Sequence, residues 1–241
     1  MEPEPTVPAA SDTAAPAASG ASAPSEDPAV QRGAATGVVA IVPVGSLEAA
    51  KSRLGEALDA EERRDLVIDL LGRTIRATAA TRGITETIVV TPDREVIALA
   101  ADLGARTLRQ HGRGLNQGLA EARVEAVAAG AEAILVVPVD LPLVTAEALA
   151  AMVGELDDPA RPVVVLVPDR HGRGTNALLV APPEAIEFCF GGDSRVAHAA
   201  CASENGARLV ELRESPLALD IDTPDDLLLI EGLRPEAVDV R

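Results

Sequence analysis

Several aspartates of this sequence stand where apolar segments end. Asp140 closes the run Ala133–Val139, and an unpaired carboxylate at the end of a buried strand is costly, so a metal ion or a cationic partner is expected. Asp220 and Asp222 are two residues apart, a spacing that puts both side chains on one face of an extended segment. A Mg²⁺ ion that also contacts substrate phosphates uses carboxylates in this way. We therefore predict a Mg²⁺ site made by these aspartates, with a structural role as the alternative for Asp222.

Basic residues follow the first apolar run. The segment Gly45–Ser52 nearly matches a phosphate-binding P-loop, but Ala50 replaces the second glycine, and its β-carbon obstructs close wrapping of a phosphate. A P-loop also leads straight into a long helix, whereas Gly55 interrupts this segment. Lys51, the only lysine of the chain, and Arg53 instead suit a cationic arm over a triphosphate, one as a point charge and the other as a bidentate fork. Two solvated basic residues on a short helix are the alternative.

Two glycine-rich loops offer hydroxyl groups and backbone amides. In the segment Pro168–Asn176 the glycines let the backbone approach a ligand and Thr175 supplies a hydroxyl, although a plain hairpin has the same composition. Gly191 and Ser194 precede a helix that we expect to begin near Arg195. The backbone amides at such a helix start bind anions, and Ser194 suits both a cap and a ligand.

The remaining unusual residues allow weaker predictions. Asn116 precedes another expected helix, where it either reads a purine edge or caps the helix. Phe188 and Phe190, the only aromatic residues, are expected to share one face of a strand and to pack in the core. The histidines show no spacing typical of metal ligands and receive no role: His111, His171 and His198.

Alternating strands and helices must position these residues. Short β-branched runs predict strands at Val38–Pro43, Thr87–Thr91, Ala133–Val139, Val163–Val167 and Ala177–Val180. Helical patterns fall at Asp59–Thr81, Arg94–Leu103, Asn116–Ala129 and Ala146–Leu156, the first with Asp59 and Glu62 as a capping box. This alternation predicts an α/β fold with a mostly parallel sheet covered on both faces. Ligands of such sheets lie beyond the carboxyl ends of the strands, where the loops described above fall.

Composition limits the class of protein. With 241 residues, 47% of them hydrophobic, the chain suits one domain, which we place at 37–233 between an Ala- and Pro-rich disordered tail at 1–36 and a C-terminal tail at 234–241. A net charge of −17 argues against nucleic-acid and anionic-membrane partners, although an acidic surface also suits a salty cytoplasm. No apolar run reaches the roughly 18 residues that span a membrane, and no signal peptide is evident, so we expect a cytoplasmic protein.

In their order along the chain, these loops resemble the guanylyltransferase family of coenzyme F420 biosynthesis. Its archaeal members are called 2-phospho-L-lactate guanylyltransferases and its bacterial members phosphoenolpyruvate guanylyltransferases. The resemblance covers roughly Val38 to Leu229. It rests on Ala50–Leu54, Leu115–Asn116, Pro138–Pro142, Pro168–Arg170, Gly174–Leu178, Phe190–Gly191 with Ser194, and Asp220–Pro224.

The resemblance implies a Rossmann-like three-layer nucleotidyltransferase fold with a mostly parallel mixed sheet. It also implies Mg²⁺-dependent transfer of GMP from GTP to phosphoenolpyruvate or 2-phospholactate, with release of pyrophosphate. A bacterial-looking composition favours phosphoenolpyruvate as this small phosphorylated acid. A sugar-phosphate or molybdopterin nucleotidyltransferase and a non-catalytic GTP-binding regulator are the alternatives.

The resemblance also assigns residues. Positions matching those that hold the phosphorylated acid are Thr175, Gly191 and Ser194. Positions matching the metal-binding acids are Asp140, Asp220 and Asp222. The family often has a lysine at the end of its first strand, where this chain has Gly45, so other basic side chains would have to contact the phosphates.

Overall fold

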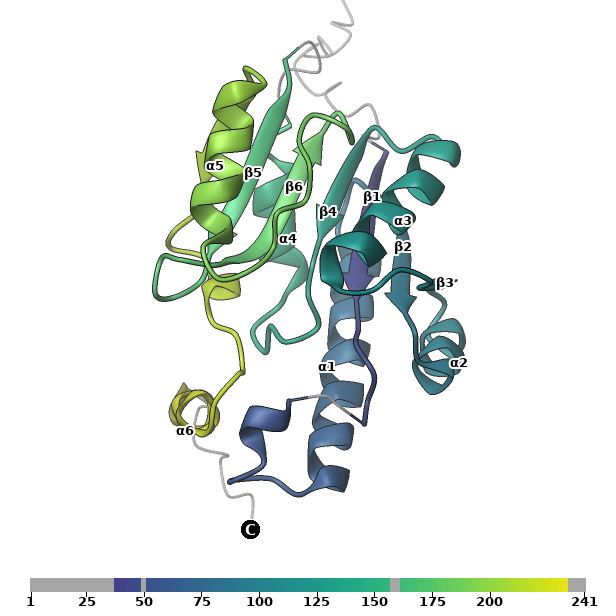
Figure 1. The fold of residues 1–241 in the computed structure, drawn as a ribbon, viewed down its shortest axis with the longest axis vertical. Coiled ribbons are helices and arrows are strands. Elements are labelled where there is room, and N and C mark those ends of the chain that lie inside the picture. Colours follow the sequence, from purple (N-terminus) through teal and green to yellow (C-terminus); the bar gives the residue numbers. More distant parts are fainter. Residues whose placement is uncertain (1–36, 49–50, 157–160, 234–241) are drawn as a thin grey trace, which may run out of the picture. The chain divides into compact units, whose positions relative to one another are not determined.

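A mixed sheet of seven strands organises the part of the chain that the structure describes (Figure 1). The computed structural model describes residues 37–48, 51–156 and 161–233, so the tails expected at 1–36 and 234–241 lie outside it. The sheet order is β3-β2-β1-β4-β6-β5-β7. The strands are β1 Val38–Pro43, β2 Ile84–Thr91, β3 Arg106–Arg109, β4 Ala133–Val136, β5 Val163–Pro168, β6 Thr175–Ala181 and β7 Arg208–Glu211.

Only β6 runs against its neighbours among these strands. It pairs antiparallel with β4 and β5, whereas β1 pairs parallel with β2 and β4, β2 with β3, and β5 with β7. Every residue of β4 and β5 is buried, because both faces of the sheet are covered and a continuous apolar run suits such a strand. The sheet is thus mixed and mostly parallel, as expected.

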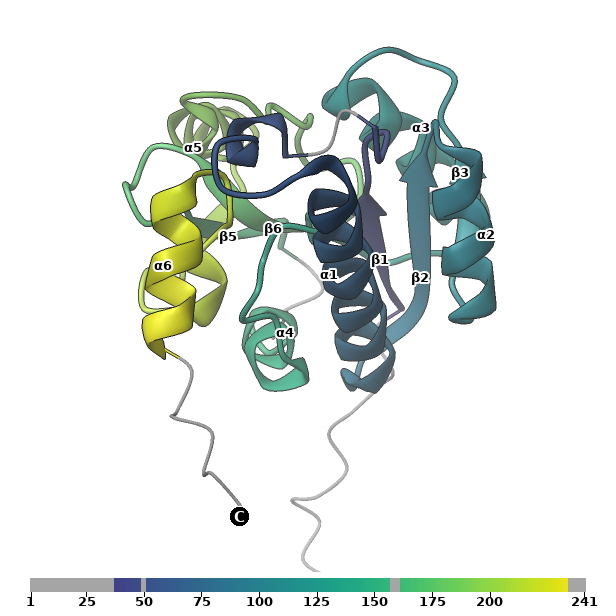
Figure 2. The ribbon, with the colours of Figure 1, turned by 90° about the horizontal axis from the view of Figure 1, so that it is seen from below.

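Helices form the outer layers of this three-layer arrangement (Figure 2). α1 and α4 pack on one face, while α3 and α5 pack on the other. The helices are α1 Ala60–Ala80, α2 Arg94–Asp102, α3 Leu115–Ala128, α4 Ala146–Val153, α5 Ser194–Glu204 and α6 Pro224–Leu233, with short 3-10 helices η2 Ser52–Leu54 and η3 Pro216–Ala218. The capping box of Asp59 and Glu62 at the start of α1 is confirmed. No helix in the described ranges has the length and apolar character needed to cross a membrane.

Some expected boundaries are wrong. β4 ends at Val136 rather than Val139, since Pro138 has no N–H with which to continue the ladder. Two strands were not predicted: β3 and β7 are edge strands whose half-buried, arginine-containing sequences lack an apolar run. The segment with Phe188 and Phe190 is irregular rather than a strand. α5 begins at Ser194, one residue early, with Asp193 as its N-cap.

Strand direction brings the loops of interest to one edge. Parallel pairing puts the carboxyl ends of β1 and β4 at the same edge of the sheet. Because β6 is antiparallel to β4, its first residue, Thr175, lies at that edge too. The carboxyl end of β5, which is antiparallel to β6, joins them at Pro168. Segments far apart in sequence therefore meet where ligands of such sheets bind.

Candidate active site

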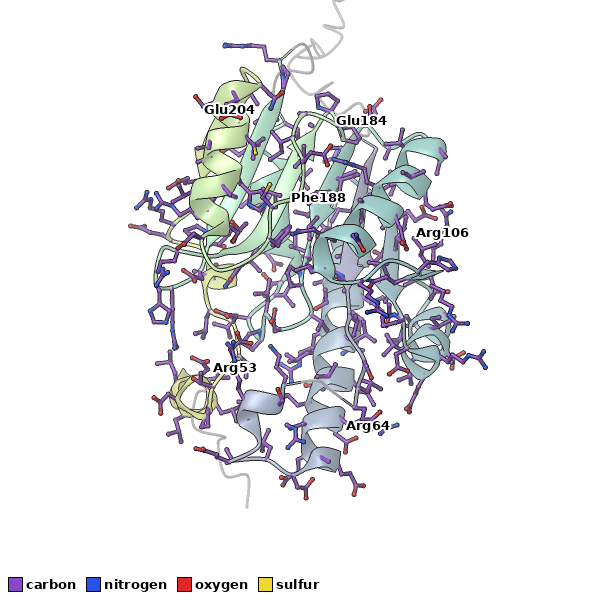
Figure 3. All side chains as sticks on the ribbon, in the orientation of Figure 1. Arg53, Arg64, Arg106, Glu184, Phe188 and Glu204 are labelled. Carbon is purple, nitrogen blue, oxygen red and sulfur yellow. The ribbon has the colours of Figure 1, made fainter. Side chains whose placement is uncertain are left out.

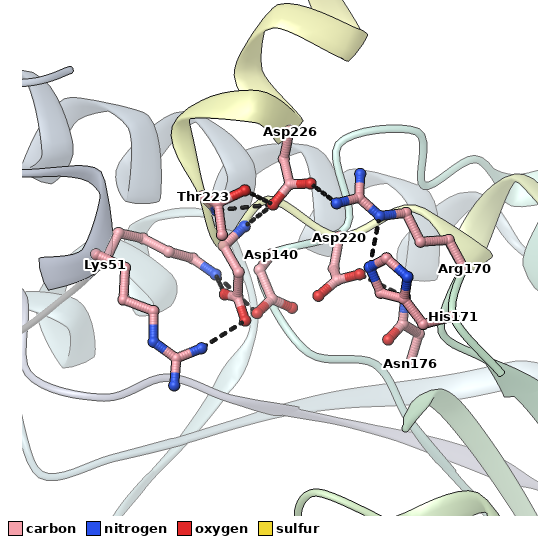
Figure 4. A network of polar contacts seen from close by, with 10 residues as sticks. Lys51, Asp140, Arg170, His171, Asn176, Asp220, Thr223 and Asp226 are labelled. Carbon is pink, nitrogen blue, oxygen red and sulfur yellow. Dashed lines mark hydrogen bonds and ion pairs between the residues drawn. The ribbon is translucent and has the colours of Figure 1, made fainter. Parts of the chain in front are cut away.

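Lys51 joins two loops at the carboxyl edge of the sheet (Figure 4). Its Nζ lies 2.8 Å from Oδ2 of Asp140 and 2.8 Å from Oδ1 of Asp222. Only 10% of the Lys51 side chain is exposed. Burial opposes the charge on the ammonium, but the attraction of Asp140 and Asp222 outweighs it and raises the pKa of Lys51. The lysine is therefore a charged and firmly held group.

Arg53 extends the positive charge toward solvent. It lies in η2, directly after Lys51, whose backbone adopts the left-handed conformation with φ of 51°. One guanidinium nitrogen of Arg53 lies 3.8 Å from Oδ2 of Asp222, and 77% of the side chain is exposed. Figure 3 shows Arg53 in the region between η2 and α6. Its guanidinium is thus both exposed to solvent and within ion-pair distance of Asp222.

Asp220 lies on the same loop as Asp222 but has a different partner. Asn176 Nδ2 donates to the Leu217 carbonyl at 3.0 Å and to Oδ1 of Asp220 at 3.3 Å. Burial raises the pKa of Asp220, and the bond from Asn176 opposes this rise. Repulsion by the negative charges of Asp140 and Asp222 raises that pKa further. Asn176 received no role from sequence, although a polar residue in an otherwise apolar strand was the available signal.

Asp226 fixes the backbone of the second carboxylate loop. Its Oδ2 accepts hydrogen bonds from the backbone N–H groups of Asp222 at 2.9 Å and Thr223 at 2.7 Å, and from the Thr223 hydroxyl at 2.9 Å. Its other oxygen pairs with the Arg170 guanidinium. Burial alone would raise the pKa of Asp226, but these donors and Arg170 lower it. Asp226 received no role in the site from sequence, and the ion pair with Arg170 was missed.

The aspartates fit Mg²⁺ by the chemistry of their oxygens. Within the described residues, no three carboxylate, imidazole or thiolate groups converge as in a preformed metal centre. Carboxylate oxygens are nevertheless the donors that Mg²⁺ prefers. The ammonium of Lys51, at 2.8 Å from both Asp140 and Asp222, shows that this point holds a cation.

The residues expected to hold the phosphorylated acid lie beside α5. Ser194 begins the helix and is 2% exposed, and its hydroxyl makes no hydrogen bond within the described ranges. Its backbone N–H donates to the carbonyl of Gly191 at 3.2 Å. Gly191 has φ of 154°, a conformation that side chains disfavour. The hydroxyl oxygen of Thr175 lies 3.0 Å from Nδ1 of His198, a histidine to which the sequence gave no role.

Asn116 forms hydrogen bonds with the loop that leads into α5. Its carboxamide donates to the Phe190 carbonyl at 3.0 Å and accepts from the Phe190 N–H at 2.9 Å. The N-cap of α3 is Gly114, without a side-chain cap, so the expectation that Asn116 caps this helix is wrong. Contact with a purine stays a prediction. Phe188 packs in the core on the α3 and α5 face, as predicted for it (Figure 3).

A cavity of about 450 Å³ opens at the carboxyl edge. That volume suits a small ligand. Of the expected site residues, Lys51, Arg53, Asp140 and Asp222 line it. In the described part of the chain, the residues outside its lining are Asn116, Thr175, Gly191, Ser194 and Asp220. The cavity therefore contains part of the predicted nucleotide and metal residues, whereas Asn116, Asp220 and the predicted acid-binding residues lie outside its lining.

A Rossmann-like sheet that gathers carboxylates and a cation at its carboxyl edge defines an α/β protein with the fold of solved nucleotidyltransferases. Two solved structures share the fold. A putative nucleotide-diphospho-sugar transferase from Desulfovibrio desulfuricans superposes with a TM-score of 0.66 at 16% identity, over 83% of this chain and 89% of its own. A nucleotidyl transferase from Methanothermobacter gives a TM-score of 0.57 at 21% identity, over 81% and 96%.

The chain belongs to the guanylyl transferase family described as CofC-like, which matches residues 38–233. A relative from Sphaerobacter thermophilus, named phosphoenolpyruvate guanylyltransferase, is 46% identical over 82% of this chain and 94% of its own length. A protein of the same name from Rubrobacter xylanophilus is 41% identical over 81% and 94%. The chain is a nucleotidyltransferase, and both the predicted fold class and the family resemblance are confirmed.

Proposed function

We propose that this protein transfers GMP from GTP to phosphoenolpyruvate in coenzyme F420 biosynthesis, forming enolpyruvoyl-2-diphospho-5'-guanosine and releasing pyrophosphate. The names of two relatives at 46% and 41% identity support this acceptor. The observation that carries the proposal is the position of Lys51, held between Asp140 and Asp222 in the lining of the edge cavity. Transfer from a nucleoside triphosphate needs cationic and carboxylate groups together at such a place.

The proposed reaction requires that the two substrates be positioned and that the negative charge of their phosphates be compensated. A phosphate oxygen of the acid attacks the α-phosphorus of GTP, the bond to the β-phosphate breaks, and pyrophosphate leaves. The attacking phosphate is already ionised at neutral pH, so no general base is required. Catalysis then rests on in-line orientation and neutralisation of the phosphates. Lys51 and Arg53, which both line the cavity, supply positive charge for the triphosphate.

The acidic and hydroxyl groups complete the proposed site. The side chains that would hold Mg²⁺ are Asp140, Asp220 and Asp222. When bound, this ion compensates phosphate charge and polarises the phosphoryl oxygens. Thr175 and Ser194 offer hydroxyls to the phosphorylated acid, and the start of α5 offers backbone N–H groups beside Gly191. Asn116, through its pair with Phe190, would keep this loop in place.

The substrates also suggest where the protein acts. GTP and a small phosphorylated acid are metabolites of the cytoplasm, and we place the enzyme there. A net charge of −17 disfavours binding to nucleic acid or to an anionic membrane, and it calls for local cations wherever phosphates bind.

Pyrophosphate release tests the proposal directly. The full chain is supplied with GTP and Mg²⁺, together with phosphoenolpyruvate or 2-phospho-L-lactate, and ATP and CTP replace GTP as controls. We expect release that depends on GTP and on the acid, with phosphoenolpyruvate preferred. A preference for 2-phospho-L-lactate would change the acceptor but keep the reaction. GTP binding without release from either acid would contradict the proposal and favour a regulator.

A further inference from the structure

A buried histidine connects the loop before α5 to the first residue of β6. His198 lies one helical turn after Ser194 and is 0% exposed. Its Nε2 accepts a hydrogen bond of 2.9 Å from the backbone N–H of Cys189. Its Nδ1 lies 3.0 Å from the hydroxyl oxygen of Thr175. Both ring nitrogens are therefore in use.

The contact with Cys189 decides which nitrogen carries the ring proton. A backbone N–H can only donate, so Nε2 of His198 presents its lone pair. A neutral imidazole has a single N–H, which is then on Nδ1 and points at Thr175. Thr175 accepts this bond, so its own hydroxyl hydrogen is directed elsewhere. Within the described residues that hydrogen has no hydrogen-bond acceptor, which leaves it for a ligand.

The surroundings hold the ring in this position and keep it neutral. The edge of the Phe190 ring meets His198, with centroids 4.9 Å apart and an interplanar angle of 73°. Asn116 in turn fixes the backbone of Phe190 through two hydrogen bonds. Burial lowers the pKa of His198 to about 4, so the imidazolium is absent at neutral pH.

We propose that His198 is a positioning residue that fixes the Thr175 hydroxyl as a hydrogen-bond donor to the phosphorylated acid. The inference rests on the proposed function, in which Thr175 contacts that acid. The acid is an anion whose oxygens only accept hydrogen bonds, so a hydroxyl that offered them lone pairs would repel it. With His198 donating from the other side, Thr175 keeps its hydrogen for the anionic oxygen.

The tautomer of His198 can be observed in the full-length wild-type protein. Long-range ¹H–¹⁵N correlation spectra distinguish the two nitrogens of each imidazole, and loss of a signal set in His198→Gln assigns this residue. We expect Nδ1 to be protonated and Nε2 to be unprotonated near neutral pH. A protonated Nε2 would overturn the inference, whatever the activity of any variant.

Kinetics then separate positioning from mere packing. His198→Met removes both hydrogen bonds, whereas His198→Gln has one acceptor and one donor and keeps the polarity of the pair. We expect His198→Met to raise the KM for phosphoenolpyruvate about tenfold or more, as loss of a hydrogen bond to an ionised group does, with the KM for GTP unchanged. His198→Gln should stay close to wild type.

A double-mutant cycle with Thr175→Val completes the test. If His198 acts through Thr175, His198→Met should have little further effect on the KM for phosphoenolpyruvate once Thr175 is valine. Independent, multiplying effects would overturn the inference while leaving the proposed function intact. An unchanged KM in Thr175→Val alone would instead remove Thr175 from the acid site, and with it the role of His198.

Discussion

The ammonium of Lys51 compensates two carboxylates that repel one another. Lys51 lies 2.8 Å from Asp140 and from Asp222, while Asp220 has no ion pair with any residue that the structure describes and has a raised pKa. A cluster that contains both a cation and acids suits a nucleotide with its metal ion. The cation can pair with the phosphates, and the acids can pair with the metal.

The substitution Asp140→Asn tests whether the Asp140 carboxylate has the proposed role in catalysis. The change removes one charge and keeps the shape, so we expect kcat to fall by about 10²–10³-fold, as when one preorganised electrostatic group is lost. Pyrophosphate release measures kcat, and the melting temperature reports whether the fold is intact. Asp225→Asn is a matched control, since it neutralises an exposed acid near the same loop and should leave kcat unchanged. A wild-type kcat in Asp140→Asn would exclude Asp140 from the site.

Each aspartate of the site was predictable because an acid at the end of an apolar segment is a local pattern. The partner of each was not. Lys51 is 89 residues from Asp140 and 171 from Asp222, and no local pattern reports a contact of that range. The same holds for His198 and Thr175, which belong to a helix and a strand separated by 23 residues.

At the scale of elements, α6 is tied to the sheet by a buried ion pair. Asp226, the third residue of α6, is 2% exposed and bonds to Arg170 in the loop after β5. The same carboxylate fixes the backbone of Asp222 and Thr223. The position of Asp222, a proposed metal ligand, therefore depends on the start of α6. In the proposed site this helix start does not itself contact a substrate.

Asp226→Asn weakens this link. Loss of the charge should destabilise the protein by about 3 kcal/mol, because the Arg170 guanidinium is left beside a neutral group in a largely buried place. Displacement of Asp222 should also lower kcat. Chemical denaturation measures the free energy of unfolding and pyrophosphate release measures kcat, with Asp225→Asn again as the control. Unchanged stability would show that the ion pair contributes little in solution.

The elements themselves were predictable where the sheet is buried and not at its edges. β1 and β5 consist of continuous apolar runs, which their burial on both faces requires. β3 and β7 lie at the two ends of the sheet order, where solvent admits Arg and Glu and the apolar pattern disappears. The irregular course of the segment with Phe188 and Phe190 was also missed. Alternating aromatic residues favour a strand locally, whereas here the rings pack against Arg123 and His198, contacts that the local pattern does not report.

For the whole molecule, His198 makes the free energy of unfolding depend on pH. The ring contacts Thr175, the Cys189 amide and Phe190, and among the described residues no ion pair reaches it. The Cys189 thiol, whose pKa burial raises, stays neutral in the acid range. Burial is the cause that lowers the pKa of His198 from 6.5 to about 4.

Stability should therefore fall as the pH decreases through this window. Between about pH 6.5 and about pH 4 the unfolded chain binds a proton on this imidazole and the folded protein does not. From about pH 7 to about pH 5 the loss should be about 2 kcal/mol. Denaturant unfolding at a series of pH values measures it, and His198→Gln should lack this part of the dependence. Identical pH profiles of the two proteins would contradict the lowered pKa.

The ammonium of Lys51 has a consequence for the order in which ligands bind. A divalent ion bound by Asp140 and Asp222, as proposed, would compete for the oxygens that the lysine already contacts. Its arrival would release the ammonium beside the cavity, where an incoming triphosphate gains a partner. In the proposed function the two binding equilibria would then be linked, and each ligand would raise the affinity for the other by the same factor. Lys51 thus occupies, as a counterion from the chain itself, the place between the two acidic loops that the proposed metal would take.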